Sequence, residues 1–291
     1  MQQDWLFTLL REPDTGETLQ LDTEGQQLVS PNKRYPINDG VPMFVETKPA
    51  GEGFDYTAHY KADAEIFDYF EEETDPMEAL HQRLLHDVTM RQVPREAKLL
   101  LDVGCGSAFV ARHFCPLGIR VVSMDVAPAN TAKALKHYPF ANHTAVTADA
   151  YHLPFADDTF DCIVASEIIE HTVNPQGFLE SLLRKVKPGG TLVVSTPYKE
   201  RIAYSLCIHC NCKTPHNAHL HSFDREKMRR LIEPLPATIE SMHLVGNKLI
   251  LRSHLAAGLS HLGMGTWRAC DNLANRMVDK TYHFVTTLKK Q

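Results

Sequence analysis

The stretch "LLLDVGCGSAFVARHF" (residues 99–114) decides the fold class of this 291-residue chain. It begins as an apolar run, breaks at Gly104-Cys105-Gly106 and resumes with the spacing of a helix. A strand, a glycine turn and a helix in that order expose backbone N–H groups at the carboxyl edge of a parallel sheet. The stretch therefore predicts a site for a nucleotide-like cofactor, and two kinds of cofactor would fit it equally well.

Strands and helices alternate beyond this stretch, which favours a parallel sheet with right-handed crossovers. Strands are expected at 98–103, 120–125, 143–147, 160–165 and 191–196, and helices near 107–114, 129–137 and 175–187. Residues 237–246 and 281–290 also have the pattern of strands, with helical sequence between them. We expect these two to end the sheet as an antiparallel pair.

The chain before the glycine turn divides into two further parts. Residues 1–48 contain short β segments separated by turn residues, such as Asn38-Asp39-Gly40, and are expected to form a small β-rich domain. Residues 49–95 are expected to form a linker and a helical lid, with helices at 57–73 and 76–92. The main domain would then span residues 96–291.

Residues beyond the glycine turn distinguish the two cofactors. The dinucleotide fingerprint needs a third glycine where this chain has Phe109, which weakens a nicotinamide reading. Asp125 ends the next strand and suits ribose hydroxyls, but both cofactors contain a ribose. Two later stretches decide, "TADAYHLPFADDTFDCIVASEIIEH" (147–171) and "LLRKVKPGGTLVVSTPY" (182–198). Together with the glycine turn they resemble the class I S-adenosylmethionine-dependent methyltransferases of the type 11, ubiquinone-biosynthesis-like branch.

This resemblance implies a fold and a cofactor site. The fold would be α/β, a doubly wound, mostly parallel seven-stranded sheet. The site would consist of Asp102, Gly104, Gly106, Asp125, Asp149 and Ala150. The two glycines would let the methionine part of S-adenosylmethionine lie against the backbone, with Asp102 near its ammonium group. Asp125 would hold the ribose, while Asp149 and Ala150 would flank the adenine. Ala108 stands where the family usually has a small glycine, which narrows the site slightly.

The resemblance also suggests residues for the methyl acceptor. Residues after the fourth strand of this family face the transferred methyl group, which makes His171 a candidate general base; a bracing role is the alternative. Tyr198 is a candidate for the acceptor pocket or for ordinary packing. The stretch with Tyr56, His59 and Tyr60 is similar to a lid over the cofactor, or to a helix that only packs between domains.

A segment rich in cysteine and histidine, "CIHCNCKTPHNAHLHSF" (207–223), lies in an expected insertion at 199–222. Its candidate zinc ligands are Cys207, Cys210, His216 and His219, with Cys212 and His221 as spare candidates. A structural zinc ion and a thiol-rich loop facing the substrate both remain open. Residues 1–48 resemble the small tRNA-methyltransferase-activator domain, but lack the cysteines with which that family often binds metal, so zinc is not expected there.

Composition narrows the functions that the chain can have. A net charge of -6 and a sequence pI near 6.2 argue against general binding to nucleic acid. No stretch of 18 apolar residues and no signal-peptide pattern is present, and the seven cysteines suit a reducing cytoplasm. Taken with the resemblance above, which implies the methyltransferase activity, these observations lead us to expect a cytoplasmic methyltransferase acting on O, N or C of a small molecule. An RNA base methyltransferase and a cofactor-binding pseudoenzyme that serves a protein partner are the alternatives.

Overall fold

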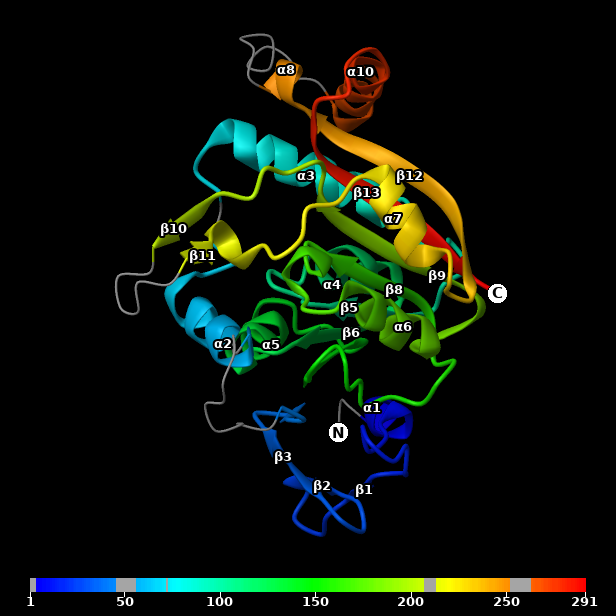
Figure 1. Ribbon diagram of the computed structural model, residues 1–291. Coiled ribbons are helices and arrows are strands. Elements are labelled where there is room, and N and C mark those ends of the chain that lie inside the picture. The colour runs from blue at the N-terminus through cyan, green and yellow to red at the C-terminus, as the bar shows by residue number, and fades with distance from the viewer. Residues whose placement is uncertain (1–3, 46–55, 72, 207–212, 252–262) are drawn as a thin grey trace. The chain divides into compact units, whose positions relative to one another are not determined.

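The computed structural model describes residues 4–45, 56–71, 73–206, 213–251 and 263–291 (Figure 1). The chain divides into two compact units. The first unit comprises Met1–Glu71, Arg95–Val164 and Glu180–Thr191, and the second Glu72–Pro94, Ala165–Leu179 and Leu192–Gln291. Three elements belong partly to each unit because the division passes through them: β8 (Phe160–Ser166), α6 (Pro175–Lys185) and β9 (Val186–Pro197).

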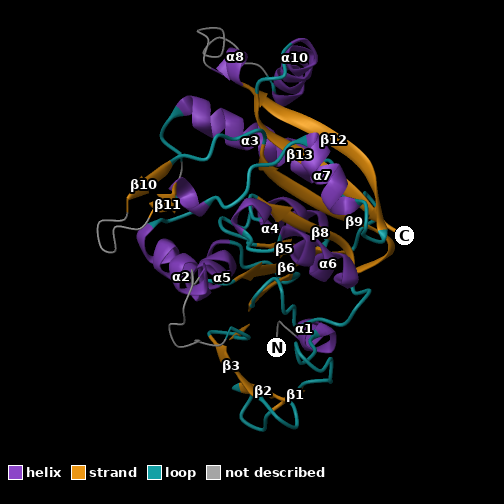
Figure 2. Ribbon diagram, viewed as in Figure 1, coloured by secondary structure: helices purple, strands orange, loops and turns teal. Residues whose placement is uncertain are grey.

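The first unit begins with a small antiparallel sheet. Its elements are helix α1 (Asp4–Leu9) and strands β1 (Gln20–Leu21), β2 (Gln27–Val29), β3 (Arg34–Asn38) and β4 (Val41–Pro42), in the order β1-β2-β3-β4. The strands are short and loops make up much of this region (Figure 2). The sequence did not predict α1, but the separate N-terminal β-sheet is confirmed.

A buried carboxylate organises the first turn of this N-terminal region. Glu12 is buried and accepts hydrogen bonds from the hydroxyl of Tyr35 (2.6 Å) and from the backbone N–H groups of Asp14 (2.8 Å) and Thr15 (2.5 Å). Burial alone would raise the pKa of Glu12, but these hydrogen bonds outweigh it and the pKa is lowered. An ionised side chain thus holds this turn.

Backbone hydrogen bonds join the N-terminal region to the rest of the first unit. Met43 forms a parallel bridge with Thr147, and the N–H of Phe44 donates to the carbonyl of Thr147 (2.7 Å). Leu10 forms an antiparallel bridge with Phe155. The N-terminal region is therefore continuous in hydrogen bonding with the main fold.

The remainder of the first unit is a parallel α/β arrangement. It consists of α2 (Tyr56–Ile66), β5 (Leu99–Val103), α4 (Phe109–Phe114), η1 (Cys115–Leu117), β6 (Arg120–Asp125), α5 (Pro128–His137) and β7 (His143–Thr147). β5 pairs with β6 and β6 with β7, both in parallel. All five residues of β5 are buried, as expected for a strand covered on both faces.

The second unit contains the antiparallel part of the sheet and the C-terminal helices. Its elements are α3 (Pro76–Met90), η2 (Ile169–His171), β10 (Tyr204–Leu206), β11 (Lys213–Pro215), η3 (His216–Ala218), α7 (Arg225–Ile232), β12 (Ala237–Asn247), α8 (Lys248–Leu251), α10 (Met264–Met277) and β13 (Thr281–Lys290). β12 and β13 are long strands that pair antiparallel from Ala237↔Lys290 to Asn247↔Thr281, as predicted. α3 begins at an Asp75 cap and buries Leu80, Leu84 and Val88 on one stripe.

The large sheet has seven strands in the order β12-β13-β9-β8-β5-β6-β7. The predicted α/β fold, with a mostly parallel sheet and an antiparallel end, is confirmed. One helix is shorter than predicted: α2 ends at Ile66 instead of residue 73, and a turn follows in which Asp68 accepts from the N–H of Phe70 (3.1 Å). Among the described residues, no helix is both long and apolar enough to cross a membrane.

Candidate functional site

The glycine turn after β5 adopts the left-handed backbone that its composition predicts. Gly104 has φ +66° and Gly106 has φ +44°, values that glycine adopts without a steric penalty. Ala108 also has a positive φ, +50°, and its side chain is fully buried. A left-handed conformation costs a non-glycine residue roughly 1–2 kcal/mol. The turn therefore maintains a strained conformation at a residue that begins α4.

Asp125 ties this turn to the start of α5. Its Oδ2 atom accepts from the N–H of Gly106 (3.3 Å) and from Nδ2 of Asn130 (3.1 Å), and its Oδ1 atom accepts from the N–H of Ala127 (2.9 Å). Burial raises the pKa of Asp125, and these donors oppose that rise. The sequence predicted Asp125 but missed Asn130, whose position in the first turn of α5 was the available signal.

Asp102 is a buried carboxyl group with an incomplete set of partners. It is 1% exposed, and its Oδ2 atom is buried and accepts no hydrogen bond from the described residues. Burial, reinforced by the charge of Asp125, raises the pKa of Asp102 well above its ordinary value. A positively charged donor beside these two carboxyl groups would satisfy the open oxygen and favour their ionised forms.

Asp149 and Ala150 follow β7 in the same unit. The Oδ1 atom of Asp149 accepts from the N–H of Tyr151 (2.9 Å), and the carbonyl of Ala150 accepts from the hydroxyl of Ser181 (2.6 Å). Both residues are half-buried. The structure thus fixes the backbone of this turn while leaving the pair partly accessible.

Tyr69 covers the glycine turn. A Cβ atom added to Gly106 would lie 3.8 Å from the Tyr69 ring, and the Tyr69 hydroxyl donates to Asp63. The neighbouring Phe70 stacks on His137 of α5, with ring centroids 4.3 Å apart. The lid was predicted around Tyr56, His59 and Tyr60. The side chains of Tyr56 and His59 lie outside the described residues, and Tyr60 is half-buried.

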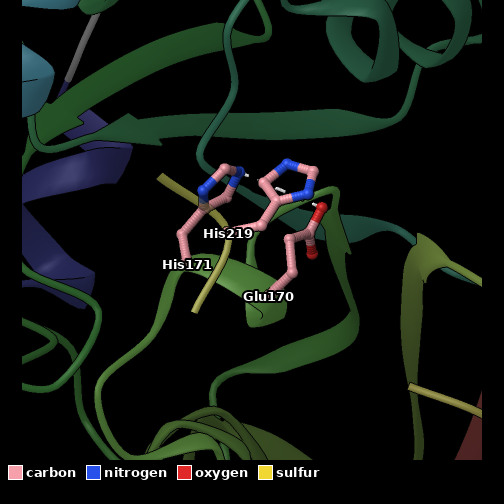
Figure 3. Close-up of side chains that lie close together, drawn as sticks. All are labelled: Glu170, His171 and His219. Carbon is pink, nitrogen blue, oxygen red and sulfur yellow. Dashed lines mark ion pairs between the residues drawn. The ribbon is translucent and has the colours of Figure 1, made fainter. Parts of the chain in front are cut away.

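A second group of polar side chains follows β8, in the second unit. Figure 3 shows Glu170, His171 and His219 pointing toward one another, and one ligand atom from each lies within 4.8 Å of the others. The rings of His171 and His219 meet edge to face at 4.7 Å. The backbone explains this meeting, because the carbonyl of Glu170 accepts from the N–H groups of Leu220 (2.8 Å) and His221 (3.1 Å).

Glu170 is the buried member of this cluster. It is 1% exposed; its Oε2 atom accepts from Thr196 (2.9 Å), while its Oε1 atom is buried and accepts no hydrogen bond from the described residues. Burial and the nearby charge of Glu167 raise the pKa of Glu170 well above its usual range. Nδ1 of His219 lies 2.6 Å from Glu200 Oε2, a contact that orients the ring. Two imidazoles and an open carboxylate oxygen are a donor set that suits a divalent transition metal.

The other residues predicted for the acceptor pocket and the zinc site differ in burial, and some lie outside the described residues. Tyr198 is 4% exposed, and its ring packs edge to face against Phe284 at 5.3 Å, so the geometry favours ordinary packing. Cys207, Cys210 and the spare Cys212 lie outside the described residues. His216 is exposed, and His219 belongs to the cluster with Glu170. The zinc site and the acceptor role of Tyr198 both stay predictions.

Comparison with known proteins identifies the fold. Residues 101–194 match the family described as "Methyltransferase domain". Residues 101–194 thus match a methyltransferase domain, and the seven-stranded sheet has the class I methyltransferase fold. The ubiquinone biosynthesis O-methyltransferase of Cereibacter sphaeroides (strain ATCC 17029 / ATH 2.4.9) is 31% identical over 121 residues, 40% of this chain and 48% of the relative. The mitochondrial ubiquinone biosynthesis O-methyltransferase of Schizosaccharomyces pombe is 34% identical over 144 residues, 43% of this chain and 52% of the relative.

A solved structure with the same fold matches a larger share of this chain than the sequence relatives do. The Burkholderia thailandensis 1,6-didemethyltoxoflavin-N1-methyltransferase, solved with 1,6-didemethyltoxoflavin and S-adenosylhomocysteine, has a TM-score of 0.54 and 15% identity. The match covers 90% of this chain and 97% of that one. At this identity the likeness shows the fold alone. The chain spans about half the length of the curated relatives it matches.

The residues of the methyltransferase domain fit S-adenosylmethionine. That molecule carries an ammonium group, a sulfonium charge and a ribose diol. The open oxygen of Asp102 suits a cationic donor, and Asp125 lies at the next strand end with acceptor oxygens. Gly104 and Gly106 place no side chain of their own at the turn where the cofactor would approach the backbone. Both observations agree with the assignment that the sequence suggested.

Proposed function

We propose that this protein is an S-adenosylmethionine-dependent methyltransferase that acts on a small-molecule acceptor. The observation that carries the proposal is the buried carboxyl pair at the glycine turn, where Asp102 has an open oxygen and Asp125 orients the turn. The matched methyltransferase family supports the same assignment. When bound, S-adenosylmethionine would supply an activated methyl group on its sulfonium.

The residues of the first unit have distinct tasks in this proposal. Asp102 would accept from the ammonium group, and Asp125 would accept from the ribose hydroxyls while Asn130 keeps its carboxylate in place. Asp149 and Ala150 would flank the adenine. Tyr69, whose ring lies against Gly106, would help to exclude water from the methionine end.

The second unit would serve the acceptor. The relatives are named as O-methyltransferases, so we propose a hydroxyl group as the acceptor atom in preference to nitrogen or carbon. Transfer to a hydroxyl needs its proton removed, and His171 is the candidate base. The alternative use of the same cluster is a divalent cation held by Glu170, His171 and His219, which would lower the pKa of a bound hydroxyl. Under the cation alternative, His171 would be a ligand and not a base.

Two aspects of the proposal concern the whole chain. Residues 1–48 would form the small N-terminal domain and 96–291 the methyltransferase domain, with the insertion at 199–222. Cys105 and Cys115 are buried and form no disulfide with any described residue, which supports the cytoplasmic location that we propose. The acidic net charge favours a small acceptor over RNA.

Calorimetry with S-adenosylmethionine tests the cofactor part, and mass spectrometry of reaction mixtures tests the transfer. We expect micromolar binding, and methylated product when catechol is offered as a hydroxyl acceptor. The Asp102→Asn variant should weaken binding of the cofactor. Binding without any methylated product across hydroxyl, amine and carbon acceptors would favour the pseudoenzyme, and absence of binding would contradict the proposal altogether.

The same assay separates the two uses of His171. A cation site predicts that Mn²⁺ binds with a stoichiometry near one, detected by electron paramagnetic resonance, and that EDTA abolishes turnover. The Glu170→Gln variant should then lose the Mn²⁺ signal. Turnover that is unchanged by EDTA, with no Mn²⁺ bound, would assign His171 to the role of base.

A further inference from the structure

Three side chains in the second unit, those of Glu167, His283 and His81, form a continuous row of hydrogen bonds. Nε2 of His283, on β13, lies 2.7 Å from Glu167 Oε2. On the other side of the same ring, Nδ1 of His283 lies 2.9 Å from Nε2 of His81, on α3. The row therefore links elements that are separated by more than 200 residues in the sequence. The sequence analysis singled out none of these residues.

The buried side chain of His81 packs closely against the backbone of β12. The side chain is buried, and a Cβ atom added to Gly246 of β12 would lie 2.9 Å from ring atoms of His81. Gly246 also has φ +77°, so a larger residue would be both strained and in collision with the ring. The ring of Tyr282 lies 5.1 Å away on another side. The glycine at position 246 is therefore required for the His81 ring to fit against β12.

The backbone N–H and both carboxylate oxygens of Glu167 have hydrogen-bond partners. Its backbone has φ +58°, an uncommon value for a residue with a side chain. Its N–H donates to the carbonyl of Ser195 (3.1 Å), and the Ser195 hydroxyl donates to Oε1 (2.8 Å), opposite the bond from His283 to Oε2. Such strain persists only where the surrounding structure over-determines it, often at functional sites.

The charge states of Glu167 and His81 determine which atoms in the row donate and which accept hydrogen bonds. Burial alone would raise the pKa of Glu167, but the nearby His283 and Ser195 outweigh it, so the pKa is lowered. An ionised Glu167 accepts only, and therefore Nε2–H of His283 is the donor. Burial and the neighbouring His283 lower the pKa of His81 to about 4, so His81 is neutral near pH 7. His81 then fixes the orientation of the His283 ring through Nδ1.

We propose that His283, braced by His81, is a positioning residue for the acceptor side of the methyltransferase, holding the Glu167 carboxylate three residues before Glu170. The inference rests on the proposed function. Glu167 and Glu170 are fixed by neighbouring residues of β9, because the Ser195 hydroxyl donates to Glu167 (2.8 Å) and the Thr196 hydroxyl donates to Glu170 (2.9 Å). A displaced Glu167 would thus change the arrangement around His171 without altering the cofactor turn of the first unit.

The experiment compares variants that remove or retain the hydrogen bond. His283→Leu removes the donor, His283→Gln retains one, and His243→Leu is a matched control on the neighbouring strand β12. We expect His283→Leu to lower kcat for catechol methylation by about 10- to 100-fold, because small errors in positioning have effects of this size. His283→Gln should recover at least a third of wild-type kcat. The Kd for S-adenosylmethionine should stay within twofold of wild type in all three.

A double-mutant cycle keeps the inference testable even if one variant is poorly folded. Glu167→Gln should lower kcat about as much as His283→Leu, and the double variant should lose little more, because both act through one carboxylate. Additive losses, or kcat within twofold of wild type in a folded His283→Leu, would overturn the inference. A His283→Gln variant as impaired as His283→Leu would also overturn it, since packing would then explain the loss.

A readout without turnover separates this inference from the proposed function. If the wild-type protein binds S-adenosylmethionine but methylates no acceptor, the proposed function fails. Long-range ¹H–¹⁵N spectra of the histidine rings then test the row by itself. The Nε2 resonance of His283 should move in Glu167→Gln and stay unchanged in His243→Leu; an unchanged resonance in both would contradict the row.

Discussion

The glycine turn of the first unit, which we propose for the cofactor, and the Glu170–His171–His219 cluster of the second unit, which we propose for the acceptor, are built in different ways. The first consists of residues close in sequence, from Asp102 to Asn130, and Asp125 is held there largely by backbone N–H groups. The second brings His219 to Glu170 and His171 across about 50 residues of sequence, and the separate His81–His283–Glu167 row spans α3 to β13. A site built on one turn can be recognised from a motif, whereas one built on long-range contacts needs a structure.

The largest effect that would test this contrast is expected at His171. His171→Ala should lower turnover by about 10²–10⁴-fold if the side chain is the general base. The Kd for S-adenosylmethionine should hardly change, because His171 is not among the residues that we propose for cofactor binding and takes no part in the hydrogen bonds that hold Asp125 in the described structure. Steady-state kinetics with calorimetry measures both quantities. Equal losses in turnover and binding, or no loss in either, would favour a bracing role.

The next effect is expected at Asp125, on the cofactor side. Asp125→Ala should weaken binding of S-adenosylmethionine by roughly tenfold or more, since a hydrogen bond to a charged group contributes about 1.5–3 kcal/mol. It also leaves Asn130 and the N–H of Gly106 without their acceptor. Calorimetry on the folded variant is the measurement. An unchanged dissociation constant would remove Asp125 from the site.

A smaller effect is expected from acid on the buried His81. Its folded-state pKa, about 4, lies below the ordinary value of 6.5, so the unfolded chain binds more protons between these values. The stabilisation is complete above pH 6.5 and is lost as the pH falls toward 4, by roughly 1–3 kcal/mol. His81→Gln should flatten this dependence in urea unfolding at pH 7 and pH 4.5. Parallel curves for variant and wild type would be the contrary result, and His152→Gln, at an exposed site, is the control.

The smallest effect is expected at Ala108. Ala108→Gly removes the left-handed strain but also a buried methyl group, so the two contributions nearly cancel. We expect the free energy of unfolding to change by less than about 1 kcal/mol. Ala111→Gly, equally buried but inside α4, should cost more because glycine weakens a helix interior. Equal losses in the two variants would show that the alanine in the turn is not strained.

Local pattern predicted much of the fold. The buried strands β5 to β7, the glycine turn and the β12–β13 pair follow from apolar runs and turn residues, which act over a few positions. Helix α1 was missed because its neighbours read as β, and α2 was drawn too long because the turn at Asp68 resembles helical sequence.

The residues proposed for the acceptor side show which contacts could not be predicted from the sequence. His171 and His219 were both singled out from sequence, but for different tasks, as a base and as a zinc ligand. The hydrogen bonds from Leu220 and His221 to the Glu170 carbonyl bring them together, and no spacing rule describes that contact. Glu200 and His283 were missed for the same reason, since each matters only through a partner in another element.

The bond between the N-terminal region and β7 has a consequence for how this chain can be divided. β7 is the outermost strand at one end of the seven-stranded sheet, and Met43 and Phe44 pair with its last residue. An uncovered edge strand offers a template on which other chains can add and aggregate. The N-terminal region thus covers the end of that edge, and we expect a chain shortened to residues 96–291 to expose more of β7 and to self-associate more readily.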